Sequence, residues 1–255
     1  MATFNSIKGL VAFVTGGSSG LGKATVDRLI RLGAKGVVAF DRNIETKFEA
    51  KNVVSVEGSV TSEDDVLKAL DACEKEFGRL DAVVNCAGIG IARKTYDFRK
   101  KVAHPLDEFK MVLEVNTLGT FNVNRLAVAL ISKNPKVNDL KGVLINTASV
   151  AAFEGQIGQV AYAASKGGIV GMTLPIARDL AVEGIRCVTI APGLFNTPLL
   201  ASLPEKVRQN LAATVPCPQR LGEPEEYAHL VQTIIENQML NGETIRLDGA
   251  IRMQP

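Results

Sequence analysis

Three polar side chains in the middle of the chain have the types and spacing for proton transfer at a carbonyl or alcohol oxygen. Tyr162 and Lys166 lie four residues apart in a predicted helix, so both side chains share one helical face. A tyrosine has a reference pKa of about 10, but a nearby ammonium group stabilises tyrosinate and lowers that pKa. Ser149 follows a predicted strand, and its hydroxyl could hold the same substrate oxygen. The set predicts acid–base chemistry.

A Tyr/Lys pair also occurs on solvated helix faces, so this interpretation depends on the rest of the chain. Residues 15–22 read Thr-Gly-Gly-Ser-Ser-Gly-Leu-Gly, between the first predicted strand and the first predicted helix. Glycines allow the backbone to turn sharply and approach a pyrophosphate, and the helix then aims its N-terminal amides at the phosphates. The position of this turn favours a dinucleotide site.

Asp41 ends the second predicted strand. A carboxylate at this place accepts hydrogen bonds from the adenosine ribose and repels the 2′-phosphate of NADP. Arg42 could meet that phosphate instead, but Asp41 carries more weight because it occupies the strand end itself. The pattern predicts NAD as the cofactor.

Short runs rich in valine and isoleucine alternate with amphipathic segments of helical length. Strands are expected at Val11–Thr15, Gly36–Phe40, Val53–Val56, Ala82–Asn85, Val143–Asn146, Cys187–Ala191 and Glu243–Leu247. Helices are expected at Leu21–Leu32, Ser62–Phe77, Phe109–Lys133, Ala161–Glu183 and Glu223–Asn237. This alternation predicts an α/β fold, a single Rossmann-type doubly wound parallel sheet in three α/β/α layers over residues 1–255. Gly90–Pro105 shows no apolar period and is expected to be a solvated loop.

Composition narrows the functional classes. The formal net charge of +2 is too small to argue for nucleic-acid binding, and no RNA-binding motif is visible. Four isolated cysteines and two histidines make a zinc site an unfavoured interpretation, so no metal is expected. No apolar run reaches the ~18 residues that span a bilayer. Met1–Leu10 has neither the apolar core of a secretory signal nor a clear mitochondrial presequence.

Taken together and in this order, the motifs resemble the short-chain dehydrogenase/reductase superfamily over essentially the whole chain. They are Thr15-x-x-x-Gly20-x-Gly22, Asn85-x-Ala87-Gly88, Asn116, Ser149, Tyr162-x-x-x-Lys166, and Pro192-Gly193 before Thr197.

The resemblance implies a role for each matching residue. Tyr162 would be the general acid/base, Lys166 would lower its pKa and bind the nicotinamide ribose, and Ser149 would orient the substrate carbonyl. Asn116 would shape its helix and hold a water that relays protons to Lys166. The implied cofactor-binding residues are Gly16, Ser18, Gly20, Leu21, Gly22, Asp41, Ser59, Val60, Cys86, Ala87, Gly88, Tyr162, Lys166, Pro192, Gly193, Phe195 and Thr197. The implied substrate residues are Ser149, Ala151, Gln159 and Tyr162, with Phe153, 199–203 and Leu211 as further walls of the pocket.

One position departs from the family pattern. Members usually carry an aspartate after the third strand that contacts the adenine, and here Ser59 stands at that place. A serine hydroxyl makes a weaker hydrogen bond to the adenine amine than a carboxylate does. We therefore expect weaker NAD binding than in relatives with aspartate.

A narrower resemblance is to the animal mitochondrial 3-hydroxyacyl-CoA dehydrogenases of type II, also called 17β-hydroxysteroid dehydrogenases of type 10. It rests on the stretches 146–155, 167–179, 191–195 and 245–255. It implies NAD-dependent interconversion of L-3-hydroxyacyl-CoA and 3-ketoacyl-CoA, including branched short chains from isoleucine breakdown, and some hydroxysteroids. It also implies a homotetramer in the mitochondrial matrix, with tRNA-processing proteins as further partners.

The loop at about 90–105 has two interpretations. Its cations could meet the phosphates of CoA, or they could form an ordinary solvated face. They are Arg93, Lys94, Arg99, Lys100 and Lys101, and His104 lies in the same loop. Two alternative functions also stay open at this point: a non-catalytic scaffold in tRNA processing, and a steroid or alcohol dehydrogenase without preference for CoA.

Overall fold

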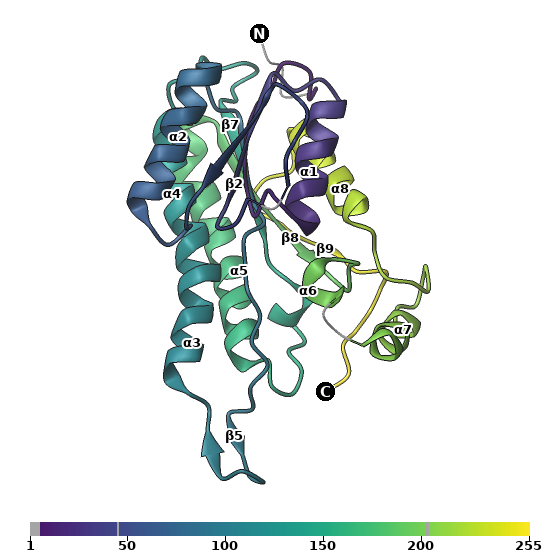
Figure 1. The fold of residues 1–255 in the computed structure, drawn as a ribbon. Helices are drawn as coiled ribbons and strands as arrows, with labels where there is room; N and C mark the ends of the chain where they lie inside the picture. The colour runs from purple at the N-terminus through teal and green to yellow at the C-terminus, as the bar shows by residue number, and fades with distance from the viewer. Residues whose placement is uncertain (1–5, 45, 202–203) are drawn as a thin grey trace.

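The structure, a computed structural model, describes residues 6–44, 46–201 and 204–255, and its centre is a seven-stranded parallel sheet (Figure 1). The strand order is β3-β2-β1-β4-β7-β8-β9. Its strands are β1 (Val11–Thr15), β2 (Gly36–Asp41), β3 (Val53–Glu57), β4 (Ala82–Asn85), β7 (Gly142–Thr147), β8 (Ile185–Pro192) and β9 (Thr244–Leu247). The order reverses between β1 and β4, which makes that point a topological switch. The predicted doubly wound α/β fold is confirmed.

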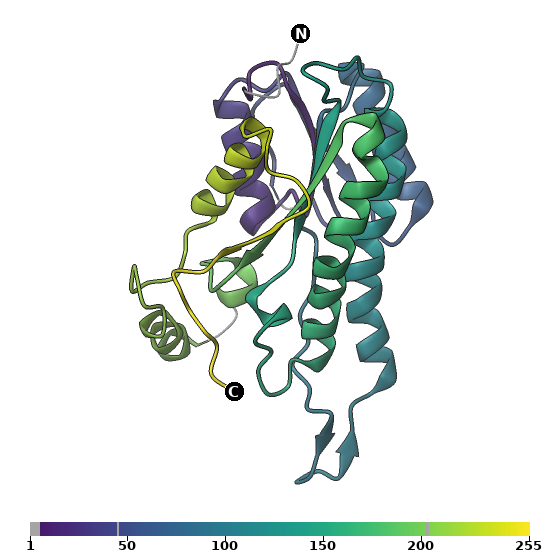
Figure 2. The same cartoon turned by 180° about the vertical axis from the view of Figure 1, so that it is seen from behind.

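Helices cover both faces of the sheet (Figures 1 and 2). They are α1 (Gly20–Arg31), α2 (Glu63–Phe77), α3 (Leu106–Leu113), α4 (Gly119–Ile131), α5 (Val160–Leu180), α6 (Pro198–Ala201), α7 (Glu205–Ala213) and α8 (Pro224–Glu236). The pair α1 and α8 packs on one face, and α2, α4 and α5 pack on the other. Within the described ranges, no helix is both long enough and apolar enough to span a membrane.

Strand β1 shows how the sequence specifies these layers. Every residue from Val11 to Val14 is buried, and successive side chains point to opposite faces of the sheet. Ala12 and Val14 join the core beneath α1 and α8, whereas Val11 and Phe13 join the core beneath α2 and α4. A strand buried on both faces reads as a continuous apolar run, which is why it could be predicted.

The predicted helix ends are set by local chemistry. Ser62 caps α2 by accepting a hydrogen bond from the Asp65 backbone N–H at 3.2 Å, and Gly78 ends the helix with a φ of 77°. At α8, the Glu223 and Glu226 side chains form a reciprocal capping box around Pro224. These signals placed both helices within a few residues of their observed bounds.

The single helix expected over Phe109–Lys133 is interrupted, so that prediction is corrected. Between α3 and α4 the turn Glu114–Leu118 is a π-helix, closed where the Gly119 N–H donates to the Glu114 carbonyl. Such a wide turn arises from hydrogen bonding that an apolar periodicity does not encode. It turns Asn116 into the interior, where its side chain is fully buried.

The loop expected over Gly90–Pro105 contains a β-hairpin. Strand β5 (Tyr96–Asp97) pairs antiparallel with β6 (Val102–Ala103), and the hairpin projects from the body beyond α3 (Figure 1). Asp97 shapes its turn by accepting the backbone N–H groups of Arg99 and Lys100 at 2.9 and 3.0 Å. Strands this short carry no detectable alternation, so the sequence pattern did not reveal them.

Candidate active site

The carboxyl ends of β1 and β4 meet at the topological switch point. Thr15 ends β1, and its Oγ1 accepts the backbone N–H groups of Cys86 and Ala87, both at 3.1 Å. Gly16 has a φ of 63°, and a Cβ added to it would lie 2.9 Å from the Ala87 nitrogen. The predicted cofactor residues Gly16, Cys86, Ala87 and Gly88 therefore lie together.

The glycine-rich turn has no room for larger residues. A Cβ on Gly22 would lie 2.1 Å from the Gly16 carbonyl oxygen, and Gly20 has a φ of 50°. Ser18 is 3% exposed, and its hydroxyl has no hydrogen-bond partner among the described residues. A buried, unpaired donor beside a helix N-terminus is a group that a bound phosphate would satisfy. The turn therefore fits a dinucleotide.

The adenosine end of the predicted site is formed by β2 and the segment after β3. One carboxylate oxygen of Asp41 accepts the Ser18 backbone N–H at 3.0 Å, which fixes the acid at the strand end. The Ser59 hydroxyl accepts the Thr61 N–H at 3.2 Å and lies 2.8 Å from the Thr61 hydroxyl. Asp65 does not replace the missing acid, since its Oδ2 accepts the Ser59 backbone N–H at 2.9 Å.

The segment after β8 approaches the same turn. Pro192 ends β8, and a Cβ on Gly193 would lie 2.9 Å from Asp248, so only glycine fits there. Thr197 side-chain atoms lie 3.6 Å from where a Cβ on Gly20 would stand. The structure thus brings the predicted residues Gly193 and Thr197 to the cofactor side of the sheet.

Three predicted cofactor residues have side chains that pack into the core. Phe195 and Val60 are 7% and 8% exposed, and Leu21 is partly buried. Leu21, on α1, and Phe195 pack into the core between the sheet and helices α1 and α8, and Val60 packs against α4 at Gly119. At these positions we expect the backbone, and not the side chain, to face a cofactor.

The structure brings the three predicted catalytic side chains together. Ser149 follows β7, and its Oγ accepts the Ala151 N–H at 3.1 Å, which fixes the rotamer. Tyr162 and Lys166 both project from the first turns of α5. The Lys166 Nζ lies 5.7 Å from the centre of the Tyr162 ring and donates to the Thr147 carbonyl at 2.8 Å.

The pKa of Tyr162 is shifted in the direction opposite to the one expected from the sequence. Desolvation of its hydroxyl raises the pKa of Tyr162, and a hydrogen bond with Ser149 opposes that rise. Burial also lowers the pKa of Lys166 to about 8. Its ammonium donates to the Thr147 carbonyl, and desolvation is the largest influence on the pKa of Tyr162.

Asn116 fastens the segment that follows β4. Its Nδ2 donates to the Ile89 carbonyl at 2.9 Å and its Oδ1 accepts the Ile89 N–H at 2.8 Å. The Nδ2 also donates to Ser165 at 2.9 Å. A Cβ on Gly88 would lie 3.1 Å from Asn116 Oδ1 and 3.4 Å from Lys166 Nζ, so both groups flank that glycine. The expected water relay stays a prediction.

The predicted substrate residues Ala151 and Gln159 lie in the segment that joins Ser149 to Tyr162. Ala151 is buried, whereas Gln159 precedes α5 and uses its Oε1 to accept the Gln156 N–H at 3.0 Å. Phe153 is 50% exposed. Of the further expected walls, the Leu199 side chain and residues 202–203 lie outside what the structure describes.

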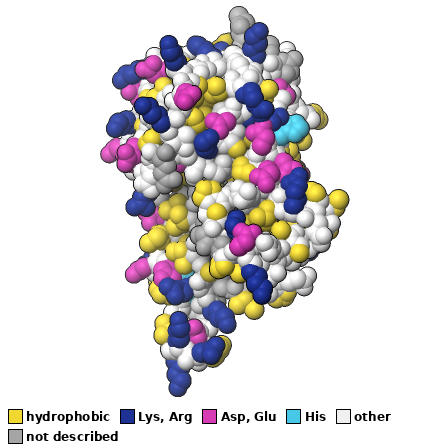
Figure 3. Space-filling view, turned by 45° about the vertical axis from the view of Figure 1, so that its right-hand side comes forward, with side chains coloured by type: hydrophobic (Ala, Val, Ile, Leu, Met, Phe, Trp, Pro, Cys, Tyr) yellow, Lys and Arg dark blue, Asp and Glu magenta, His cyan; other side chains and the backbone are white. Residues whose placement is uncertain are grey.

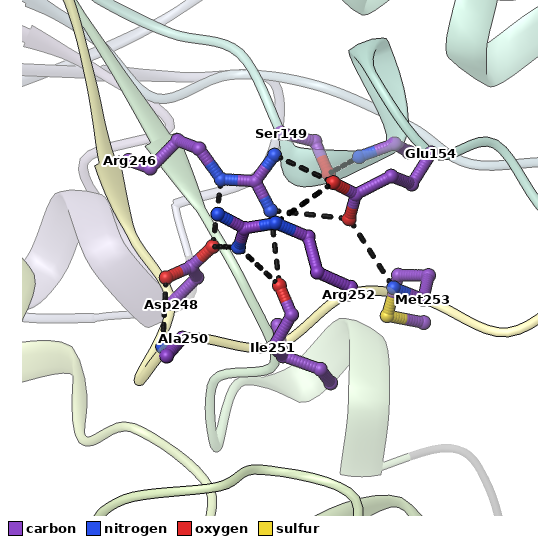
Figure 4. Close-up of polar contacts among 9 residues, drawn as sticks. Ser149, Glu154, Arg246, Asp248, Ala250, Ile251, Arg252 and Met253 are labelled. Atoms are coloured by element: carbon purple, nitrogen blue, oxygen red, sulfur yellow. Dashed lines mark hydrogen bonds and ion pairs between the residues drawn. The ribbon is translucent and has the colours of Figure 1, made fainter.

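Sequence reasoning missed an ionic cluster that joins the C-terminal tail to the Ser149 loop (Figure 4). Arg246 donates to both carboxylate oxygens of Glu154, at 2.9 and 3.1 Å, and its Nε donates to Asp248 at 2.7 Å. Arg252 pairs with the same two acids at 3.4 and 3.2 Å. Arg246 holds the pKa of Glu154 below its usual value. No sequence signal pairs groups so far apart in the chain.

The described residues contain no group of three or more His, Cys, Asp or Glu side chains placed to hold a metal ion. Cys73 and Cys187 are buried, Cys86 is partly buried and Cys217 is exposed, all as free thiols.

Comparison with known proteins decides the family. A profile of the short chain dehydrogenases matches residues 10–208. The chain belongs to the short-chain dehydrogenase family. Its members are oxidoreductases that generally use a nicotinamide dinucleotide, and the groups brought together at the switch point fit that cofactor.

Several short-chain dehydrogenases resemble this chain over its whole length. It is 60% identical to 3-hydroxyacyl-CoA dehydrogenase type-2 of Homo sapiens over 259 residues, covering 100% of this chain and 99% of that protein. The Drosophila melanogaster protein of the same name is 58% identical over 98% of this chain and 100% of its own length. The crystal structure of 3-hydroxyacyl-CoA dehydrogenase type-2 from Mycobacterium avium superposes with a TM-score of 0.92, at 41% identity over 97% of each chain.

Proposed function

We propose that this short-chain dehydrogenase uses NAD to interconvert L-3-hydroxyacyl-CoA and 3-ketoacyl-CoA with short or branched acyl chains. The observation that carries the proposal is the full-length identity of 58–60% to proteins named 3-hydroxyacyl-CoA dehydrogenase type-2. The chain also holds Ser149, Tyr162 and Lys166 together beside a turn that fits a dinucleotide. Some hydroxysteroids are proposed as further substrates.

Asp41 is the main reason to propose NAD over NADP. Its carboxylate stands at the end of β2, held by the Ser18 N–H, where the ribose of a bound dinucleotide would lie. A 2′-phosphate at this place would meet a like charge with little room to move away. Arg42 follows on the exposed side of the turn and has no such anchor among the described contacts.

The proton chemistry is assigned to residues of this chain. When bound, the nicotinamide supplies the hydride that reduces the ketone and accepts it in the reverse direction. Ser149 holds the substrate oxygen, and Tyr162 donates a proton to that oxygen during reduction or removes one during oxidation. Lys166 supplies a positive charge 5.7 Å from the centre of the Tyr162 ring, which favours tyrosinate.

The hairpin is proposed to contact the phosphates of CoA. Arg93 at its base is already paired with both oxygens of Glu108, at 2.8 and 2.9 Å. Lys94 lies exposed at the base next to Arg93, whereas Arg99, Lys100 and Lys101 lie exposed at the tip, and Figure 3 shows dark blue side chains gathered at that end of the molecule. Phosphates are bound well by such clusters of cations.

We also propose a homotetramer located in the mitochondrial matrix. The support for assembly is a set of exposed apolar side chains along α3, the π-turn, α4 and α5. They are Met111 (49% exposed), Leu118 (59%), Phe121 (44%) and Leu174 (43%). Apolar side chains gathered along neighbouring helices mark a surface that another copy could cover. The matrix location rests on the resemblance alone.

A substrate panel tests the proposed function. Initial rates are measured with NADH or NADPH and three ketones: acetoacetyl-CoA, free acetoacetate and a ketosteroid. We expect turnover of acetoacetyl-CoA with a strong preference for NADH and little turnover of the free acid. Turnover of the steroid without turnover of the thioester would replace the proposed substrate class. Binding of NADH without turnover of any ketone would favour the scaffold alternative.

A further inference from the structure

A chain of buried hydrogen bonds connects helix α8 to the carbonyl group that holds Lys166. The Tyr227 side chain on α8 is 0% exposed, and its hydroxyl lies 2.7 Å from Thr147 Oγ1. The Thr147 Oγ1 donates to the Asn85 carbonyl at 2.6 Å. The backbone carbonyl of the same Thr147 accepts the Lys166 ammonium at 2.8 Å. One residue at the end of β7 therefore receives both Tyr227 and Lys166.

The available hydrogens fix which group donates in each of these hydrogen bonds. A threonine hydroxyl has one hydrogen, and the Asn85 carbonyl can only accept it. Tyr227 must therefore donate to Thr147 Oγ1. The Tyr227 oxygen can then accept the thiol hydrogen of Cys86, whose Sγ lies 3.5 Å away. The order Cys86 to Tyr227 to Thr147 to Asn85 crosses the carboxyl ends of β4 and β7.

The hydroxyl of Tyr227 is not required for packing. Its ring lies in the apolar core between α8 and the sheet, where phenylalanine would fill nearly the same space. A buried hydroxyl gains little net stability even when it is hydrogen-bonded. Its contact with Thr147, the residue whose carbonyl accepts Lys166, indicates a role in fixing the end of β7.

We propose that Tyr227 and Thr147 are positioning residues, which hold the Thr147 carbonyl so that the Lys166 ammonium stays charged beside Tyr162. The inference rests on the proposed acid–base function and deepens it. Neither residue touches substrate, and both act through Lys166. Without the bond from Tyr227, the end of β7 can shift, and the carbonyl becomes a poorer acceptor for the ammonium.

The titratable groups that face Lys166 in the described part of the chain are Tyr162 on α5 and Cys86 after β4, with Tyr227 behind Thr147. Burial raises the pKa of Cys86 to about 11, so the thiol stays neutral at physiological pH. Burial raises the pKa of Tyr227 as well. Both therefore act as neutral hydrogen-bonding groups, and a change at Tyr227 reaches Lys166 through Thr147.

The test compares Tyr227→Phe with a matched loss of a buried hydroxyl elsewhere. Thr173→Val serves as the control, because Thr173 is buried and its hydroxyl lies 2.6 Å from that of Thr189, outside the site. Thr147→Val and Thr147→Ser form a second pair, in which serine keeps the hydroxyl. The pKa of Lys166 is read in the enzyme without cofactor, from the pH titration of carbon-13-labelled lysine, with Lys166→Arg assigning the signal. The pH profile of kcat for 3-hydroxyacyl-CoA oxidation is the second readout.

We expect Tyr227→Phe and Thr147→Val to lower the pKa of Lys166 by about half a unit or more. The apparent pKa of Tyr162, read from the pH profile of kcat for oxidation, should rise by about the same amount. Thr147→Ser should restore both values, and Thr173→Val should move neither. If Tyr227→Phe fails to fold, the Thr147 pair decides the question.

An unchanged pKa of Lys166 in a folded Tyr227→Phe would overturn the inference, as would an equal shift in Thr173→Val. The two proposals fail separately. If the enzyme turns over no acyl-CoA, the lysine titration still tests the role of Tyr227. If turnover is normal and the titration does not respond, only the role of Tyr227 is lost.

Discussion

Ser149, Tyr162 and Lys166 are brought together because the sequence encodes them locally. Tyr162 and Lys166 could be predicted to share a face because they lie four residues apart in one helix, α5. Ser149 could be placed because it follows the end of one strand, β7. The contact of Lys166 with the Thr147 carbonyl could not be predicted, because it joins α5 to a strand end in three dimensions. The same holds for Tyr227, which reads from sequence as one more apolar position of α8.

Ser59 supports a prediction on cofactor affinity. Its hydroxyl is already engaged with Thr61, so it has little left to offer an adenine amine. Ser59→Asp supplies a charged acceptor and should lower the Kd for NAD by about fivefold, equivalent to roughly 1 kcal/mol for one charge-assisted hydrogen bond. Fluorescence or calorimetric titration measures it. Ser55→Asp, which adds the same charge at an exposed position of β3, is the control. A Kd that stays the same or rises would refute this expectation.

Lys166 gives a prediction on stability against pH. Its pKa is about 8 in the folded chain, against an ordinary value of 10.5, so between these values the unfolded chain binds more protons. Stability from this group therefore rises with pH across that window. From pH 8 to pH 10, the free energy of unfolding of the wild type should rise by about 2 kcal/mol relative to that of Lys166→Met. Urea unfolding at both pH values measures the difference, and parallel behaviour of the two proteins would argue against a buried ammonium.

At the scale of elements, the strands and most helices were predictable because each is marked by burial or by a cap. The π-turn at Glu114–Leu118 and the hairpin at Tyr96–Ala103 were not, since both depend on hydrogen bonds that leave no periodic signal. The link between Arg246 and Glu154 escaped for a related reason, because 92 positions separate the two residues. It fastens β9 to the loop that follows Ser149.

The hairpin is the element on which the CoA assignment depends. Replacing both Lys100 and Lys101 by glutamine should raise the KM for acetoacetyl-CoA about threefold to tenfold, since each charge contributes modestly at an exposed site. The KM for NADH should not change. The control combines Lys51→Gln, in the exposed turn before β3, with Lys68→Gln, at an exposed position of α2, and so removes the same amount of charge. This control should leave both KM values unchanged. An unchanged KM for the thioester in the hairpin variant would show that the hairpin does not bind CoA.

At the scale of the whole molecule, the sheet order brings together the strand ends that carry or precede many of the predicted site residues. Parallel strands present their carboxyl ends together, so Thr15, Asn85, Thr147 and Pro192 meet although they are far apart in the chain. The doubly wound topology could therefore be predicted together with the site. The homotetramer was expected from the resemblance alone, because the sequence pattern does not show which apolar helix faces lie open in the fold.

The apolar surface over α3 to α5 predicts a change in oligomeric state. Phe121→Glu would place a charge in the proposed contact between copies, and burying an unpaired carboxylate there is costly. We expect the proposed tetramer to dissociate, as measured by light scattering after size-exclusion chromatography. Met239→Glu, at a side chain that is 92% exposed beyond α8, is the matched control. Equal masses for Phe121→Glu and wild type would place the contact elsewhere.

The most direct test of the central claim is the rate of acetoacetyl-CoA reduction by NADH in Tyr162→Phe. The variant keeps the ring and removes only the hydroxyl that exchanges the proton. We predict that kcat falls by about a hundredfold to ten-thousandfold, the usual range for losing a general acid, while the Kd for NADH stays close to that of wild type. A variant that retains most of the wild-type kcat would contradict the assignment of Tyr162 and the acid–base account built on it.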